Sequence, residues 1–186
     1  MKSLEWQESF KVDISLASPE DARDIREVQY ITWLATYLNN KVGITIEDVK
    51  DRFKDAFTEE NIKKRQETIE HQPESEKIFI ARVNGKIVGF CKMIKFENRN
   101  QLGAIYVVPD YQGKGFGYSL WNRALEFIDL SKNTFVDVAD YNINAISFYS
   151  KIGFVDTGDR WSDEKFKMKS GATIPEMRMI LKRKEV

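Results

Sequence analysis

The sequence predicts a mixed α/β (or α+β) fold in which one sheet carries helices on both faces. Strand and helix patterns follow one another as strand, two helices, hairpin, strand, helix, strand, helix and two strands. Two apolar runs between Ile78 and Ile94 flank Asn84-Gly85, the strongest short hairpin signal because a type I′ turn needs positive φ at both positions. An apolar run over 102–108 then leads through a glycine-rich loop into an amphipathic helix.

The N-terminal part predicts a strand followed by helices. Apolar and polar side chains alternate over residues 10–16, the period of a half-buried strand. Ser18-Pro19 supplies an N-cap and a first-turn proline for a helix that runs toward Tyr37. Thr45 caps a second helix through a capping box, and the charged residues 58–76 are expected to be helical in part.

The C-terminal part predicts three more strands after the central one. The apolar run over 102–108 predicts a buried fourth strand, and the segment 135–139 predicts a fifth strand. The apolar face of the helix between them comprises Leu120, Trp121, Ala124, Leu125 and Ile128. A short helix begins near Ala145, and the last two strands occupy Phe154 onward and 173–181.

Length and composition bound the class of protein. The 186 residues, 42% of them hydrophobic, suit one folded domain over 1–186. Because 29 Lys and Arg balance 29 Asp and Glu, no net basic field attracts nucleic acid or an anionic membrane, and we expect neither as a partner. The sequence shows neither a signal peptide nor an apolar stretch near the roughly 20 residues that span a bilayer.

Two residues that often carry chemistry lack partners in the sequence. Cys91 is the single cysteine, so we expect no disulfide, a reducing compartment and a cytoplasmic location. It falls inside a predicted strand and is expected to be a core residue. His71 lies in a charged stretch without further ligands at suitable spacing, so we expect no metal site there.

The loop between the buried fourth strand and the next helix is the strongest chemical signal. Gly113, Gly115 and Gly117 open the helix. Glycines there let backbone N–H groups face one concave spot, and the helix N-terminus adds about half a positive charge. A diphosphate is therefore the expected ligand. Lys114 is followed by glycine instead of Ser or Thr, which argues against a nucleoside triphosphatase loop.

Two segments resemble the GCN5-related N-acetyltransferase (GNAT) superfamily. Gln112-Gly113-Lys114-Gly115-Phe116-Gly117 resembles its acetyl-CoA loop, Gln/Arg-x-x-Gly-x-Gly/Ala. The second segment resembles Asn-x-x-Ala-x-x-Phe-Tyr-x-x-x-Gly-Phe, and here its residues are Asn142, Ala145, Phe148, Tyr149, Gly153 and Phe154. The Trp33–Tyr37 helix and the ending over 171–177 resemble the PaiA-type spermidine and spermine acetyltransferases.

This resemblance implies a fold and a cofactor. The fold is a mixed, mostly antiparallel seven-stranded sheet whose fourth and fifth strands splay apart. Acetyl-CoA would lie in the slot, with its pantetheine arm along the backbone of Ile105, Tyr106 and Val107. The backbone N–H near Val107 would polarise the thioester carbonyl. Gly113 to Tyr118, including Phe116, would hold the diphosphate.

The resemblance also suggests catalytic residues. Asn142 and Tyr149 are seven residues apart, about two helical turns, so both can face the cofactor. Tyr149 would donate a proton to the departing thiolate, and Asn142 would orient the cofactor. Polyamine acetyltransferases often have a glutamate where this chain has Gly103, so the general base is unassigned; Asp140 is the nearest substitute in sequence.

The acceptor is open at this stage. The expected reaction is direct acetyl transfer in a ternary complex to a small-molecule primary amine, with spermidine or spermine as the leading candidates. A protein lysine or N-terminal amine is a second acceptor class, and a non-catalytic acyl-CoA-binding regulator is an alternative of another kind. The enzyme would be a monomer or a homodimer.

Overall fold

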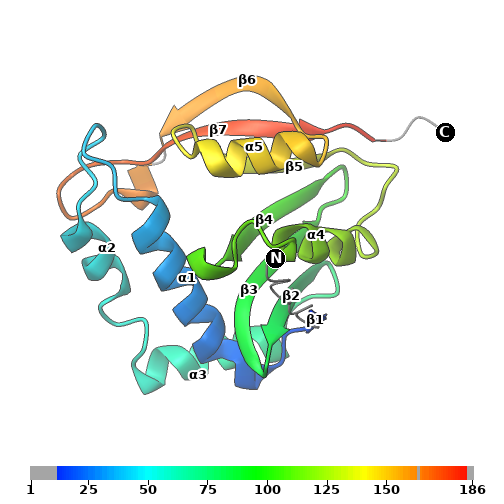
Figure 1. The fold of residues 1–186 in the computed structure, drawn as a ribbon, viewed down its shortest axis with the longest axis horizontal. Helices are drawn as coiled ribbons and strands as arrows, with labels where there is room; N and C mark the ends of the chain where they lie inside the picture. Colours follow the sequence, from blue (N-terminus) through cyan, green and yellow to red (C-terminus); the bar gives the residue numbers. More distant parts are fainter. Residues whose placement is uncertain (1–11, 163, 184–186) are drawn as a thin grey trace, which may run out of the picture.

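The structure is a computed structural model, and it describes residues 12–162 and 164–183 (Figure 1). The strands are β1 (Asp13–Leu16), β2 (Glu76–Val83), β3 (Lys86–Lys95), β4 (Asn100–Val107), β5 (Thr134–Ala139), β6 (Val155–Ser162) and β7 (Pro175–Leu181). The helices are α1 (Ala22–Thr36), α2 (Ile46–Phe53), α3 (Glu59–Glu70), α4 (Phe116–Leu125) and α5 (Ile143–Lys151). Short 3-10 helices cover Pro19–Asp21, Pro109–Tyr111 and Glu164–Phe166.

The strands form one mixed sheet of seven in the order β1-β2-β3-β4-β5-β7-β6. Every neighbouring pair is antiparallel except β4 and β5, which run parallel. This arrangement confirms the predicted mixed, mostly antiparallel seven-stranded sheet. Residues 10 and 11 of the predicted first strand lie outside the described residues.

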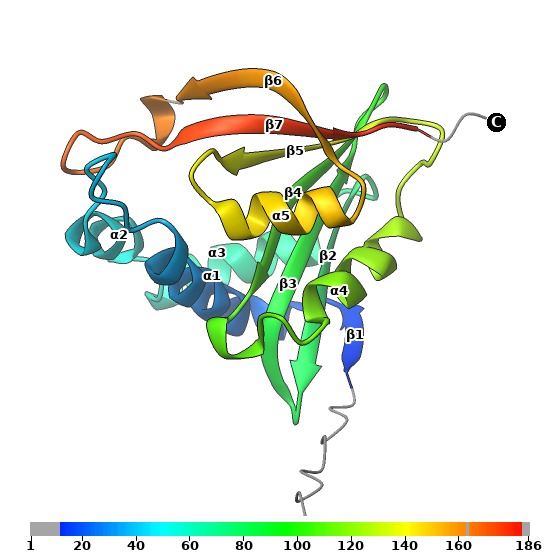
Figure 2. The ribbon, with the colours of Figure 1, turned by 45° about the horizontal axis from the view of Figure 1, so that its top comes forward.

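The sheet opens in its middle. β4 pairs with β5 only at Asn100–Thr134, Gln101–Phe135 and Leu102–Val136, and no later pair joins these two strands in the part of the chain that the structure describes. Figure 2 shows β4 turning away from β5, while β5 stays beside β7. The predicted splay of the fourth and fifth strands is therefore confirmed.

Helices pack on both faces of the first half of the sheet (Figure 2). The period-two pattern of β2 explains this, because Phe79 and Ala81 belong to the core cluster shared with α4, whereas Ile78 and Ile80 belong to the cluster shared with α1. Burial of each such large apolar side chain stabilises the fold by roughly 1.5–3 kcal/mol. These two layers hold α1 and α4 on opposite sides of β4.

Local signals placed several elements correctly. Asn84 and Gly85 have φ of 50° and 80°, as the type I′ hairpin requires. Thr45 accepts a hydrogen bond from the N–H of Asp48, confirming the capping box. The helix after the fourth strand is shorter than predicted: it ends at Leu125, before the buried Ile128, because the chain turns there.

No helix among residues 12–162 and 164–183 has the length and apolar character needed to cross a bilayer.

Candidate active site

A cavity of about 870 Å³ lies where β4 and β5 part. Its walls come from the exposed edge of β4, the start of α4, one face of α5 and the C-terminal end of α1. The predicted cofactor residues that line it are Ile105, Tyr106, Val107, Gln112, Gly113, Gly115, Gly117, Tyr118, Asn142 and Tyr149. Two segments distant in sequence thus meet in one hollow.

The glycine loop before α4 forms one end of the cavity. Gly113 and Gly115 have φ of 73° and 89°, in the region that glycine occupies without strain, and no atom lies within 4 Å of a Cβ built at either position. The first turn of an α-helix leaves N–H groups without intrahelical partners. Gln112 ties the loop to β4 because its Nε2 donates to the carbonyl of Val107 at 2.8 Å. The loop is an open, positively polarised concavity.

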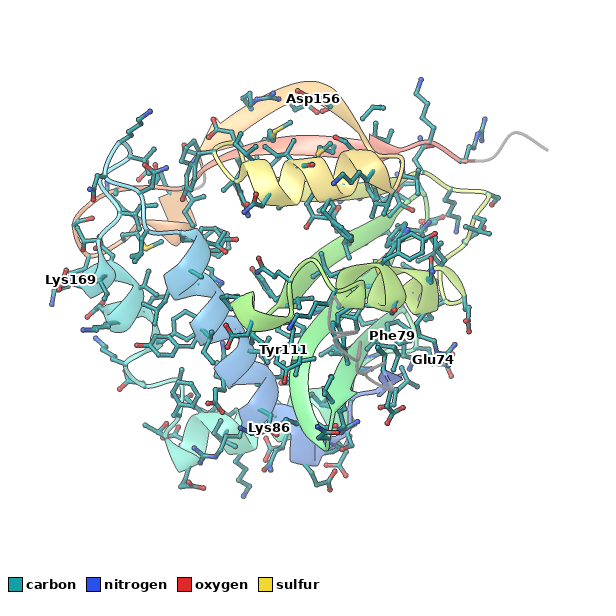
Figure 3. All side chains as sticks on the ribbon, viewed as in Figure 1. Glu74, Phe79, Lys86, Tyr111, Asp156 and Lys169 are labelled. Atoms are coloured by element: carbon teal, nitrogen blue, oxygen red, sulfur yellow. The ribbon has the colours of Figure 1, made fainter. Side chains whose placement is uncertain are left out.

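Two predicted loop residues turn their side chains away from the cavity. Phe116 is 1% exposed and packs edge-on against Tyr111, with ring centroids 5.5 Å apart. The ammonium of Lys114 lies 5.3 Å from the centroid of the same Tyr111 ring, which Figure 3 labels beside the turn before α4. Neither Lys114 nor Phe116 is among the residues that line the cavity.

The edge of β4 supplies unpaired backbone. Ile105, Tyr106 and Val107 pair with β3 on one side, and on the other side they face the cavity past the last β4–β5 pair. Gly89 of β3 allows the close approach, because a Cβ there would lie 2.7 Å from the carbonyl oxygen of Tyr106. An extended ligand arm can therefore pair with β4 as a missing strand would.

The two predicted residues of α5 lie at different depths. Asn142 is the N-cap of α5, and its Oδ1 accepts the N–H of Ala145 at 3.1 Å, which leaves the amide nitrogen for a ligand. Tyr149 is 6% exposed and packs against Phe154 at a centroid distance of 5.9 Å. Burial raises the pKa of Tyr149 far above its ordinary value, so its hydroxyl keeps its proton.

The cavity is also lined by a cluster of three tyrosines that the sequence did not reveal. The hydroxyls of Tyr37 and Tyr106 lie 3.4 Å apart, and the hydroxyl of Tyr141 donates to the carbonyl of Tyr37 at 3.4 Å. All three line the cavity. Burial is the first cause that raises the pKa of each, to about 12 for Tyr141, so the cluster is neutral near pH 7.

A carboxylate also acts on this tyrosine cluster. Glu176 of β7 pairs with Ala139 of β5, so their side chains share one face of the sheet. Ala139 packs in the core cluster against which Tyr37, Tyr106 and Tyr141 lie. Burial is the main cause that raises the pKa of all three tyrosines, and the negative charge of Glu176 is a smaller contribution to each. At Tyr106 the positive charge of Arg52 acts in the opposite direction and lowers the pKa. The sequence does show apolar–polar alternation in the last strand. That alternation predicts which face of the sheet Glu176 lies on only when the register of β7 on β5 is known.

The structure does not bring Asp140 into the cavity. Its side chain is exposed and it is not among the lining residues, although its charge, after burial, helps to raise the pKa of Tyr141. Its N–H donates to the carbonyl of Pro175 at 3.0 Å. Gly103 does line the cavity, and a Cβ at this position would make only ordinary contacts, the nearest at 3.5 Å to Ile94.

The remaining candidates behave as structural residues. Cys91 is fully buried, and burial raises the pKa of its thiol far above the usual range, so it is no nucleophile at neutral pH. The side chain of His71 is 76% exposed at the end of α3. Within the described ranges, no group of three or more His, Cys, Asp or Glu side chains could hold a metal ion.

The chain is similar to one protein family and to several curated proteins. The family model described as "Acetyltransferase (GNAT) family" matches residues 46–154. An uncharacterized N-acetyltransferase of Methanocaldococcus jannaschii is 38% identical over 85 residues, 41% of this chain and 38% of that protein. Spermidine N(1)-acetyltransferase of Vibrio cholerae is 29% identical over 94 residues, 47% of this chain and 54% of that protein. The matches thus span about half or less of these curated relatives.

Among solved structures, the chain is similar to the PaiA N-acetyltransferase of Thermoplasma acidophilum, which was crystallised in complex with coenzyme A. The TM-score is 0.71 at 20% identity, over 92% of this chain and 99% of that one. At this identity the likeness establishes the fold.

Proposed function

The chain belongs to the GNAT family of acetyltransferases, and we propose on this basis that it transfers the acetyl group of acetyl-CoA to a primary amine of a small molecule. One observation carries the proposal: the cavity at the parting of β4 and β5 joins an unpaired strand edge to the glycine loop of α4. A strand edge suits the amide-rich pantetheine arm, and a helix N-terminus suits a diphosphate. The acetyl-CoA loop resemblance falls on this same turn.

The donor end uses backbone groups. The N–H groups of Gly113 to Tyr118 would hold the diphosphate, and the edge of β4 over Ile105–Val107 would pair with the pantetheine arm. Acetyl-CoA supplies an activated acetyl thioester. The N–H near Val107 would polarise its carbonyl oxygen, and one such donor typically contributes about 3 kcal/mol to lowering the barrier.

Tyr149 is the proposed proton donor to the departing sulfur. Its hydroxyl holds a proton throughout the neutral range because burial raises its pKa. A coenzyme thiol ionises near ~8.5 by analogy with cysteine, so the buried tyrosine is the weaker acid and full proton transfer to sulfur is uphill on its own. Tyr149 would donate a hydrogen bond to the sulfur as negative charge develops there, and the proton that the thiol finally takes would be replaced by the one that the amine nitrogen loses. The contribution expected of such a donor is about 10²-fold in rate.

The acceptor end must bind an ammonium and remove its proton. Deprotonating an alkyl ammonium of pKa about 10.4 at pH 7 costs about 4 to 5 kcal/mol. We assign this end to the cluster of Tyr37, Tyr106 and Tyr141 with Glu176, whose charge reaches all three hydroxyls. The hydroxyl pair of Tyr37 and Tyr106 offers a route for the proton toward that carboxylate. Asp140, the base suggested by sequence order, has the less favourable position because it is exposed outside the cavity.

A polyamine such as spermidine or spermine is our proposed acceptor. It is supported by the name of the Vibrio cholerae relative, the likeness to a PaiA fold and the negative charge of Glu176 at the acceptor end. We further propose that residues 1–186 act as one acetyltransferase domain in the cytoplasm, as a monomer or a homodimer.

The test is acetyl transfer to a panel of amines. The full chain is incubated with acetyl-CoA and spermidine, spermine, simple monoamines, free amino acids or a lysine peptide, and the release of free thiol is followed. We expect spermidine or spermine to give the highest kcat/KM. A lysine peptide that outcompetes both would reassign the acceptor to protein. Tight acetyl-CoA binding without thiol release above hydrolysis for any amine would refute the enzyme and favour a regulator.

A further inference from the structure

A group of arginines gathers on the helical layer that flanks the cavity. The helix α1 packs against both α2 and α3 at one end of the molecule (Figures 1 and 2). Each contributes one member of the group, Arg26 from α1, Arg52 from α2 and Arg65 from α3. We call these residues the arginine cluster.

The cluster lacks compensating negative charge. Among the described residues, no carboxylate oxygen lies within 4.0 Å of a guanidinium nitrogen of Arg26, Arg52 or Arg65. By contrast, Arg23, one turn earlier on α1, pairs with Glu59 at 2.8 Å. The chain therefore neutralises an exposed arginine of α1 and leaves its more buried neighbour without an ion pair.

The donors of the cluster are incompletely satisfied. The Nε atoms of Arg26 and Arg65 are both buried, and neither has a hydrogen-bond acceptor among the described residues. Arg26 donates from Nη1 to the Oε1 of Gln29 at 2.8 Å, a neutral partner. The guanidinium of Arg52 stacks 4.7 Å above Trp33, which orients it without cancelling its charge. A buried donor without an acceptor typically costs about 1–3 kcal/mol.

The charges act on one another. Burial and then the charge of Arg52 lower the pKa of Arg26, and burial and then the charge of Arg26 lower the pKa of Arg65 to about 10. Arg26 is thus within electrostatic reach of both others. Like charges so placed favour an anion that can accept hydrogen bonds from more than one guanidinium.

We propose that Arg26 and Arg65, with Arg52 beside them, form a binding site for a phosphate-type oxyanion. A phosphate group presents acceptor oxygens in several directions, so guanidiniums from different helices can each donate to it. A carboxylate presents only two oxygens in one plane. The site is distinct from the glycine loop, which lies at the start of α4 on the opposite face of the sheet.

Occupancy of this site would strengthen the helical layer beside the cavity. Arg26 lies on the same helix as Thr32 and Thr36, which line the cavity, and Tyr37 caps that helix. A ligand that joins α1 to α2 and α3 would fix α1 in place. The inference concerns binding alone and does not depend on the proposed acetyl transfer.

The test is thermal unfolding of the full chain in sodium phosphate against sodium chloride of equal ionic strength. Phosphate at ten times its dissociation constant should raise the unfolding midpoint by about 4 °C. Sodium acetate in a parallel arm should give a smaller rise, and an equal rise would reassign the ligand class to carboxylates. Saturating coenzyme A in a third arm should leave the phosphate effect intact; its disappearance would mean that phosphate acts at the coenzyme site.

Variants locate the effect. Arg26→Gln and Arg65→Gln should each fold at least as stably as the wild type in chloride, because repulsion is relieved, and should lose the phosphate effect. Arg23→Gln, the matched change at a paired arginine of α1, should keep it. Arg65→Lys retains the charge without the planar fork and should respond weakly. A wild type indifferent to phosphate, or a full phosphate response in Arg26→Gln and Arg65→Gln, would overturn the proposal.

Discussion

Two regions of this molecule present positive charge, and they are built in opposite ways. The turn of Gly113 to Gly117 uses backbone N–H groups at the start of α4, and Gly113 and Gly115 leave the space beside them open. The arginine cluster uses side chains from three separate helices. A backbone site is encoded in one short run of sequence, whereas a side-chain site exists only after the helices have packed. This difference determines which region can be predicted from the sequence. It also determines which substitutions should remove binding at each region.

The largest effect is expected from a substitution that disrupts the backbone site alone. Gly115→Asp places a carboxylate in the concavity that would hold the diphosphate, and we expect coenzyme A affinity to fall about 10³-fold, measured by calorimetry. Gly85→Asp is the matched control, because Gly85 also has positive φ, 80°, with open space around it but lies in the distant hairpin. Both changes carry similar backbone strain, so only the coenzyme affinity should separate them.

The same variant tests the independence of the two regions. Gly115→Asp should leave the phosphate-induced rise in the unfolding midpoint unchanged. A loss of that rise would show that phosphate binds the glycine loop, and the comparison between the two regions would collapse.

The second effect concerns chemistry at the backbone site. Tyr149→Phe removes the proposed proton donor and should lower kcat by about 10²-fold while coenzyme A affinity changes less than about threefold. Tyr30→Phe is the control, since the Tyr30 ring packs on Phe53 and Phe57 and Tyr30 is not among the residues that line the cavity. Equal kcat in the wild type and in Tyr149→Phe would remove Tyr149 from the mechanism.

The sequence anticipated the first region far better than the second. The loop over 112–117, the Asn84-Gly85 hairpin and the parting of the fourth and fifth strands all follow from local patterns or from the family resemblance, and the structure bears out the last two. Glycine position and strand alternation are local properties, so one sequence suffices to read them.

Site residues that are brought together only by tertiary packing could not be predicted from their order in the sequence. Tyr37, Tyr106 and Tyr141 come from three elements, and Glu176 reaches them only through the register of β7 on β5. The same reason separates Asp140 from the cavity, because adjacency to a strand end does not fix the direction of a side chain. The arginine cluster could not be predicted from the sequence, because charged residues on amphipathic helices usually face solvent.

A third effect tests how side chains hold the helical layer. Burial disfavours the ionised form of Asp48, yet hydrogen bonds from Thr45 and Ser170 outweigh it and lower the pKa of Asp48 to about 2. The stabilisation, about 2 kcal/mol, is therefore present above pH 3.8 and is lost as the pH falls through about 2.

Asp48→Asn should accordingly cost about 2 kcal/mol at pH 7 and flatten the dependence of the free energy of unfolding on pH between about 4 and 2. Denaturant unfolding across that range measures it, with the exposed Glu47→Gln on the same helix as the control. A retained acid slope in Asp48→Asn would show that another carboxylate carries it.

The smallest expected effect lies between the two regions, at the acceptor end. Glu176→Gln should lower kcat/KM for the amine by about tenfold and shift its rise with pH to higher values, with coenzyme A affinity unchanged. Asp140→Asn should alter neither the rate nor the profile. If Asp140→Asn gives the larger shift, the base suggested by sequence order is the correct one.

A crystal structure of the complex with coenzyme A tests the central claim most directly. We expect the diphosphate on the N–H groups of residues 113–118 and the pantetheine arm paired with the backbone of Ile105–Val107, between strands that stay parted beyond Leu102. Coenzyme A bound elsewhere, or β4 and β5 hydrogen-bonded along their whole length, would contradict the account.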